Sequence, residues 1–344
     1  MTAKQIDYLN IGLMLFACIV AIYLPFQLFL VSYAILGPLH YLTEIGWLDN
    51  RNYFSKNKKD ARILVFLCAL VSIAFAIYQF PLFESTKNWS TFLNSSRLEP
   101  LVTFFVEYEK SFIFIAFYIA VLLTFVKQKK TRYLLIIPGV IAAYFLNEVT
   151  AYVMIIGIML PTVIHVYLFT GAFILFGALK SKSVSGYASL MVFIFILFLI
   201  ILQRPKAADY QLSEYWINVM KASSFHKINF AIADFFGWVK GQYFVFSTIG
   251  LKMQIFIAFA YTYHYLNWFS KTKIINWHKV SKTKLVATAI IWICSVALYF
   301  YDYKLGLAAL FFLSVLHVFL EFPLNHLTFV GIYNEVKNRI LPNK

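Results

Sequence analysis

The stretch IGLMLFACIVAIYLPFQLFLVSYAILGPLHYLTE, from Ile11 to Glu44, contains no charged side chain before its last residue. About 20 apolar residues in a helix cross the roughly 30 Å hydrocarbon core of a membrane. The stretch is long enough for two such helices. Pro25 falls near its middle, and proline ends or breaks a helix because it lacks a backbone N–H. The stretch therefore predicts a pair of membrane-spanning helices at the start of the chain.

Similar apolar runs recur along all 344 residues, which are 61% hydrophobic and only 13% charged. Soluble domains average about 25% charged residues, so the composition predicts an all-α, polytopic integral membrane bundle that forms a single transmembrane domain, 1–344. Pro25 and Pro161 are expected to divide two of the longest runs, and eight or nine helices are alternatives to ten. The predicted helices are at about 9–24, 26–47, 62–80, 111–126, 133–153, 159–179, 187–203, 250–269, 285–301 and 306–330.

The net charge of +15 comes from basic residues in short clusters between the apolar runs. Such clusters are typical of cytoplasmic loops rather than of nucleic-acid binding. With a cytoplasmic N-terminus, 20 of the 30 Lys and Arg residues fall in segments predicted inside. This asymmetry predicts that both termini are cytoplasmic, in a bacterial inner membrane, with no nucleic-acid partner. The segment 204–249 is then an extracytoplasmic loop, and its run INFAIADFFGWV predicts an amphipathic segment on the membrane surface or a lid over a cavity.

Ionisable side chains at membrane depth cost roughly 2.5–3.5 kcal/mol each on insertion scales, and they therefore mark candidate sites. Seven such residues fall inside predicted helices: His40, Glu44, Glu148, His165, His264, His317 and Glu321.

Two of the predicted helices repeat one spacing, a histidine followed four residues later by a glutamate. His40 precedes Glu44, and His317 precedes Glu321. Residues four apart lie on one face of a helix. Histidine and carboxylate side chains that face inward from several helices are typical of metal sites in helical bundles. The pattern predicts a metal held by the four histidines, with Glu44, Glu321 and Glu148 as further ligands or as groups that orient the imidazoles.

Three short stretches resemble the Brp/Blh family. The segment Gly37-Pro38-Leu39-His40 with Glu44 is similar to an early motif of that family, Gly-Leu-Pro-His followed by aspartate. The runs YHYLNWF around His264 and LHVFLEF around His317 are similar to its later histidine-bearing helices. Here the Pro and Leu are exchanged, glutamate replaces aspartate, and the Trp-His-x-x-x-His pair of the family is missing.

The resemblance implies an integral membrane iron enzyme that splits β-carotene with dioxygen to give retinal. The leading hypothesis is therefore a membrane-embedded oxygenase that uses Fe²⁺ and dioxygen on a long apolar substrate, such as a carotenoid, which enters from the lipid bilayer.

Two other classes of function remain open. A proton-coupled transporter would use the same buried histidines and glutamates as a relay. A lipid-linked glycan polymerase or ligase would place its chemistry in the long outer loop, at Arg204, Glu214, His226 or Asp234.

Overall fold

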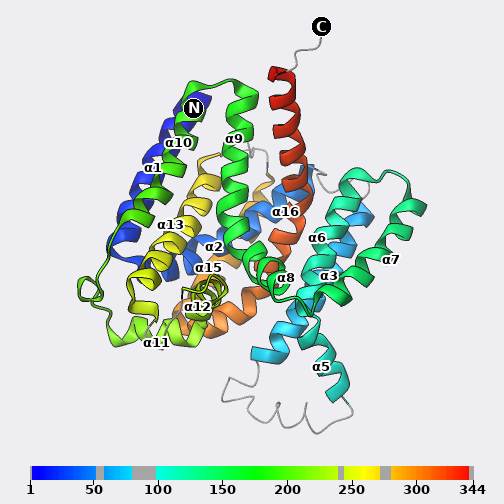
Figure 1. Ribbon diagram of the computed structural model, residues 1–344, viewed down its shortest axis with the longest axis horizontal. Helices are drawn as coiled ribbons and strands as arrows, with labels where there is room; N and C mark the ends of the chain where they lie inside the picture. The colour runs from blue at the N-terminus through cyan, green and yellow to red at the C-terminus, as the bar shows by residue number, and fades with distance from the viewer. Residues whose placement is uncertain (1, 52–57, 80–97, 239–243, 272–279, 341–344) are drawn as a thin grey trace. The chain divides into compact units, whose positions relative to one another are not determined.

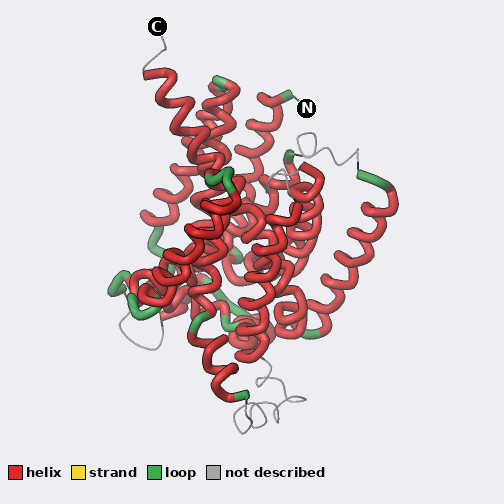
Figure 2. The backbone as a smooth tube through the Cα atoms, turned by 90° about the vertical axis from the view of Figure 1, so that its right-hand side faces the viewer, coloured by secondary structure: helices red, strands yellow, loops and turns green. Residues whose placement is uncertain are grey.

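The computed structural model describes residues 2–51, 58–79, 98–238, 244–271 and 280–340. Within these ranges the chain is helical and contains no strand, as Figure 2 shows. The chain divides into two compact units. The first comprises residues 1–43, 162–307 and 327–344, and the second comprises 44–161 and 308–326.

The first unit is built around helix α13, which packs against α1, α10 and α12 (Figure 1). The helices that lie wholly in this unit are α1 (Ala3–Tyr23), α9 (Thr170–Ser181), α10 (Val184–Leu202), α11 (Glu214–Ser223), α12 (Phe225–Phe235), α13 (Thr248–Ser270) and α15 (Lys282–Tyr301), with the short η4 (Ala207–Asp209) and η5 (Phe244–Phe246). Three further helices contribute residues to both units: α2 (Pro25–Arg51), η3 (Val153–Phe169) and α16 (Tyr303–Ile340).

The second unit contains helices that pack on α6, which contacts α3, α5 and α7. These helices are α3 (Lys58–Gln79), α5 (Glu99–Glu107), α6 (Glu109–Phe125), α7 (Lys129–Leu146) and the single turn α8 (Thr150–Tyr152). The α6–α7 contact is close because Gly139 leaves room for the ring of Tyr118. The hydroxyl of Tyr118 donates to the carbonyl of Leu135 across this contact, at 3.0 Å.

A helix is present at each of the ten places where the sequence predicts one. By length and composition, six of the described helices can cross a membrane, and seven can if the bent pair α5–α6 forms one span. Ten membrane spans therefore stay a prediction. Pro25 divides its run as expected, since α1 ends at Tyr23 and α2 begins at Pro25.

The prediction that Pro161 divides the second long run is wrong. Pro161 lies inside η3, which continues directly into α9 without a turn. The break falls earlier, at residues 147–149, where α7 ends. A π-helix tolerates the missing N–H of proline because its hydrogen bonds already depart from the regular i→i−4 pattern.

The beginning of α1 and the last turn of α16 lie at the same end of the first unit. Near the start of α1, the carboxylate of Asp7 accepts hydrogen bonds from Ser183 and Ser185, at the beginning of α10. Near the end of α16, Arg339 donates to the carbonyl of Leu179 at the end of α9. The start of α1 and the end of α16 are therefore close together; that both termini are cytoplasmic stays a prediction.

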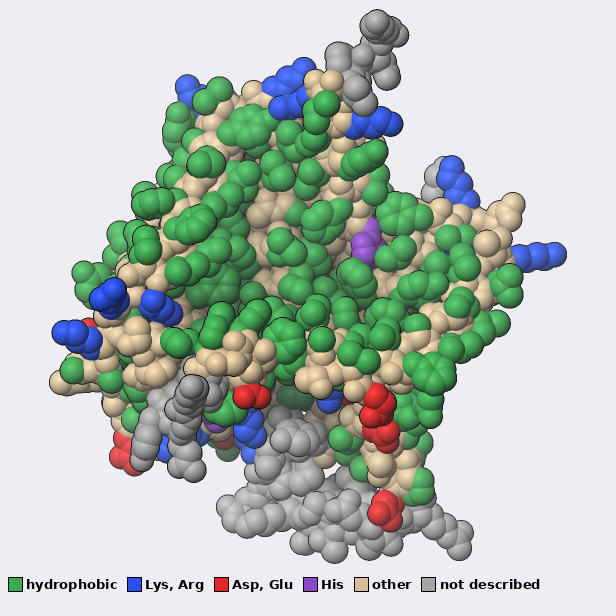
Figure 3. Space-filling view, in the orientation of Figure 1, with side chains coloured by type: hydrophobic (Ala, Val, Ile, Leu, Met, Phe, Trp, Pro, Cys, Tyr) green, Lys and Arg blue, Asp and Glu red, His purple; other side chains and the backbone are tan. Residues whose placement is uncertain are grey.

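The surface of the first unit is apolar. Figure 3 shows hydrophobic side chains over most of the visible face of α9 and α10. On α10, Met191, Phe195 and Leu202 are each more than 60% exposed. Water would penalise such a face, whereas lipid would not. With the long apolar helices, this surface identifies the chain as an integral membrane protein.

A buried polar network joins α1 to α13. The amide nitrogen of Asn10 donates to the hydroxyl of Ser270 at 3.0 Å, and its amide oxygen accepts from the hydroxyl of Tyr263 at 3.2 Å. All three side chains are buried. The network fixes the register of two helices that flank the candidate site.

We expect Asn10→Leu to destabilise the protein by about 1–3 kcal/mol, because it leaves the buried hydroxyl of Tyr263 without its partner. Thermal unfolding in detergent measures this loss. The double variant Asn10→Leu/Tyr263→Phe should recover part of it, since both polar groups are then gone. A single variant as stable as wild type would contradict this account of the network.

Candidate metal centre

His264 contacts Thr170, His40 and His165. It lies on α13, and its side chain is 7% exposed. Its Nδ1 lies 2.8 Å from the hydroxyl of Thr170, the first residue of α9. When Nδ1 donates to this hydroxyl, Nε2 carries the lone pair that a metal needs. The contact with Thr170 therefore orients the ring, and it is compatible with the tautomer that leaves Nε2 free for a metal.

His40 faces His264 from α2. Their Nε2 atoms are 3.0 Å apart, and the ring centroids are separated by 4.7 Å. Pro38 lies inside α2 and cannot donate to the carbonyl of Ala34. One residue further along α2, the carbonyl of Ile35 accepts a hydrogen bond from Trp292 at 2.8 Å. A side chain from another helix therefore braces α2 just before His40.

The turn before His40 is shaped by Gly37. A Cβ atom at this position would lie 2.5 Å from the hydroxyl of Tyr41 and 3.4 Å from that of Tyr265. Only glycine leaves room for these two hydroxyls to meet beside the helix. The ring of Tyr265 is 5.2 Å from that of His40, and both tyrosines are buried. The glycine of the GPLH segment thus lets the two tyrosines pack close to the histidines.

His165 approaches His264 from η3. Its ring centroid lies 4.9 Å from that of His264, and its side chain is 2% exposed. η3 is a π-helix over 17 residues. π-Helical turns are rare and frequent at functional sites. The wider turn changes the direction in which a side chain leaves the helix, and here it presents His165 to α13.

His317 completes the group. It lies on α16. Each of the four histidines offers a ring nitrogen, and these four nitrogens lie within 4.8 Å of one another. All four side chains are buried. Among the described residues, this is the one group of three or more side chains that could hold a metal ion.

The donor set fits a transition metal. Imidazole nitrogens bind such metals at about 2.0–2.1 Å, so two of them at a right angle are about 3 Å apart. The separation of 3.0 Å between Nε2 of His40 and Nε2 of His264 equals this value. Neutral imidazoles suit iron, zinc, copper and nickel. The cluster therefore could hold a metal ion, and its ligands alone do not select which one.

The surroundings of the cluster are aromatic. Trp268 lies with its ring centroid 5.6 Å from that of His40. Its indole nitrogen donates to the hydroxyl of Thr43 at 2.9 Å, which ties α13 to α2 next to the histidines. Phe169 lies 6.3 Å from His165. Aromatic packing of this kind excludes water from the rings and strengthens the electrostatic interactions within the site.

The three predicted acidic residues fall in two different environments. Glu44 and Glu321 are each 2% exposed, one turn after His40 and His317 on the same helices. Glu148 instead lies in the turn between α7 and α8 and is exposed, so it is not inside a helix as the sequence predicted. None of the three belongs to the four-nitrogen group. Their roles as ligands or orienting groups stay predictions.

The residues proposed for a glycan polymerase show no comparable grouping. Arg204, Glu214 and Asp234 are exposed, and His226 contacts the carbonyl of Met220 through its Nδ1 at 3.2 Å. The run INFAIADFFGWV falls on α12 and the turn after it, where the aromatic rings of Phe236 and Trp238 are about half exposed. Its placement on the membrane surface stays a prediction.

Sequence reasoning missed Thr170, Tyr265 and Trp268. Tyr265 follows His264 directly, and Trp268 comes one helical turn later. Aromatic residues are so frequent in this chain that neither residue stands out in the sequence. Thr170 lies 94 residues from His264 in the chain.

Comparison with family models, with curated proteins and with solved structures finds no significant match. The fold and the site therefore define the class without a family: a polytopic helical membrane protein with a buried group of four histidines that could hold a metal ion.

Proposed function

We propose that the protein is a membrane-embedded non-haem iron oxygenase that acts on a long apolar substrate, with a carotenoid as the first candidate. The observation that carries the proposal is the set of four buried histidine nitrogens within 4.8 Å of one another. A soluble reactant such as a sugar or nucleotide would need a polar, hydrated pocket, whereas these histidines are enclosed by aromatic and aliphatic side chains.

The resemblance to the Brp/Blh family supports iron over the other metals that imidazole binds, and it suggests β-carotene as substrate. Iron bound to the histidines would supply the redox chemistry that lets dioxygen react with a closed-shell polyene. Insertion of both oxygen atoms across one carbon–carbon double bond gives two carbonyl products and needs no external reductant.

The side chains of this protein have separate roles in the proposal. His40, His165, His264 and His317 hold the metal as neutral imidazoles. Thr170 orients His264 through Nδ1. Glu44 and Glu321 are proposed to orient His40 and His317 from the next turn of the same helices. Aromatic side chains around His40 exclude water, and the apolar outer surface lets a lipid-soluble substrate arrive from the bilayer.

Expression of the full chain in cells that accumulate β-carotene tests the proposal. We expect the cells to lose colour and to form retinal, and protein purified without chelator to contain iron. His40→Ala should abolish both results, and His226→Ala should abolish neither, because His226 lies on α12 outside the group. Metal-free protein that keeps its function in chelator would overturn the oxygenase. Iron without bleaching would exclude β-carotene and redirect the search to other lipids.

One contact also favours a second candidate, a proton-coupled transporter. Two Nε2 atoms 3.0 Å apart can share a proton as well as a metal. In that case chelators would leave the protein active, and reconstituted vesicles would acidify in response to a transported solute. Stoichiometric iron in the purified protein decides between the two candidates.

A further inference from the structure

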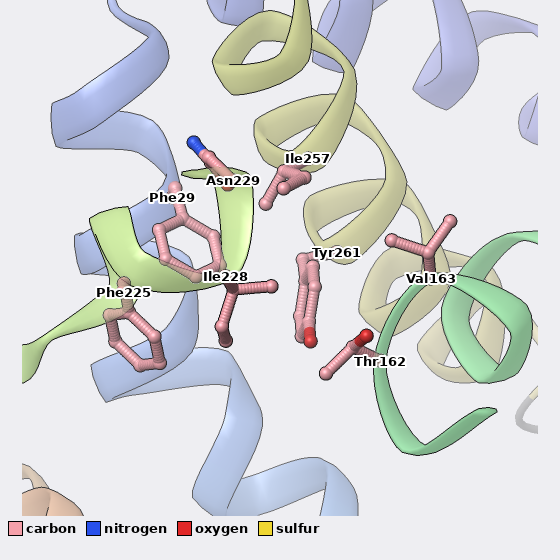
Figure 4. Close-up of a pocket in the computed structure, with 8 residues that line it drawn as sticks. All are labelled: Phe29, Thr162, Val163, Phe225, Ile228, Asn229, Ile257 and Tyr261. Atoms are coloured by element: carbon pink, nitrogen blue, oxygen red, sulfur yellow. The ribbon is translucent and has the colours of Figure 1, made fainter. Parts of the chain in front are cut away.

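A small cavity lies in the first unit between α2, η3, α12 and α13 (Figure 4). Apolar side chains form most of its wall: Phe29, Val163, Phe225, Ile228 and Ile257. It has room for roughly one molecule of the size of water or dioxygen.

The lining does not suit water. A buried water needs two to four polar partners. The amide nitrogen of Asn229 is already committed to Gln254, to which it donates at 2.8 Å. In Figure 4, the hydroxyls of Tyr261 and Thr162 lie beside each other at one edge, while the rest of the wall is hydrocarbon. Apolar cavities stay dry, and an engineered apolar cavity of about 150 Å³ binds benzene or xenon.

The cavity lies close to the candidate metal centre along two helices. Thr162 precedes His165 by three residues, and Tyr261 precedes His264 by three. Three residues of α-helix rise about 4.5 Å, so on α13 the wall of the cavity is about one turn from a proposed ligand. The ring of Tyr261 lies 6.2 Å from that of Tyr265, which packs on His40 at 5.2 Å.

α12 closes the cavity on the side of the 204–249 segment. The ring of Phe225 packs edge-on against Phe29 at 4.8 Å and against Tyr33 at 4.9 Å. Asn229, held by Gln254, fixes the same helix to α13. Gln254 in turn donates to the carbonyl of Pro25 at 3.1 Å. These contacts fix α12 at the edge of the cavity without filling the cavity.

We propose that this cavity is a binding site for dioxygen next to the histidine cluster. The inference rests on the proposed function, because an oxygenase must bring an apolar diatomic gas to its metal. Dioxygen is more soluble in hydrocarbon than in water, and an apolar cavity inside the bundle concentrates it within about one helical turn of His264.

Xenon tests the site directly, since it is apolar, close to dioxygen in size and visible by X-ray scattering. We expect crystals of the full chain under xenon pressure to show an atom between Val163, Ile228 and Ile257. Ile257→Phe should remove it by filling the space, and Ile257→Ala should raise its occupancy. The matched control is Ile293→Phe, on α15, where the side chain is 60% exposed. No xenon in the wild-type cavity would overturn the proposal.

Steady-state kinetics test the function of the site. In Ile257→Phe, the Michaelis constant for dioxygen should rise severalfold at unchanged iron content, while kcat at saturating dioxygen changes little. If that variant fails to fold, Val163→Ile adds one methylene to the same space and should show a smaller change in the same direction. An unchanged Michaelis constant in a variant that has lost xenon would overturn the proposal. Iron-free wild-type protein would instead overturn the proposed oxygenase, since xenon binding does not depend on the metal.

Discussion

If the four histidines hold a metal as proposed, replacing His264 with alanine is expected to remove it almost completely. His264 touches two other members of the cluster, with its Nε2 3.0 Å from that of His40 and its ring 4.9 Å from that of His165. Loss of a group that orients a ligand already costs 10–100-fold in metal affinity. Loss of the central ligand should therefore lower the metal content by more than about tenfold. Elemental analysis of protein purified without chelator measures the effect.

Two controls separate loss of the ligand from loss of the fold. His226→Ala removes a histidine outside the cluster and should keep the full metal content. Free imidazole added to His264→Ala should enter the space left by the ring and restore part of the metal. His264→Ala protein that binds metal as wild type does would show that this histidine is a packing residue.

Thr170→Val is expected to weaken metal binding by about 10–100-fold while leaving the protein folded. Valine has nearly the shape of threonine but cannot bond to Nδ1 of His264, which lies 2.8 Å from the threonine hydroxyl. Without that partner the ring loses a contact that fixes its orientation. Competition with a chelator of known affinity measures the change.

Thr170→Ser is the matched comparison, because it keeps the hydroxyl and removes only a methyl group. It should bind metal within a fewfold of wild type. Equal affinities for Thr170→Val and wild type would mean that the Thr170 contact does not tune His264, whatever the metal content of the histidine variants.

The positions of the helices could be predicted from the sequence because burial in lipid is a local property of the chain. Each apolar run must satisfy its own backbone hydrogen bonds, so it forms a helix wherever it stands. That is why a helix is found at each predicted place, and why Pro25 marks the boundary between α1 and α2.

The same reasoning failed where the helix geometry itself changes. The sequence predicts that Pro161 ends a helix, but Pro161 lies inside the π-helix η3. The break lies at 147–149, and it leaves Glu148 exposed in a turn. No local pattern distinguishes a π-helix from an α-helix in a uniformly apolar run, since nearly every position is apolar whichever face it occupies.

The histidines themselves stood out in the sequence, since ionisable groups at membrane depth are costly and rare. The sequence did not show that these histidines lie together in the fold. His40 and His264 are separated by 224 residues, and Thr170 and His264 by 94. Spacing within a helix shows which side chains share a face, but not which faces meet. That depends on how the helices pack, and so only the tertiary structure brings the four ring nitrogens to within 4.8 Å of one another and places Thr170 beside His264.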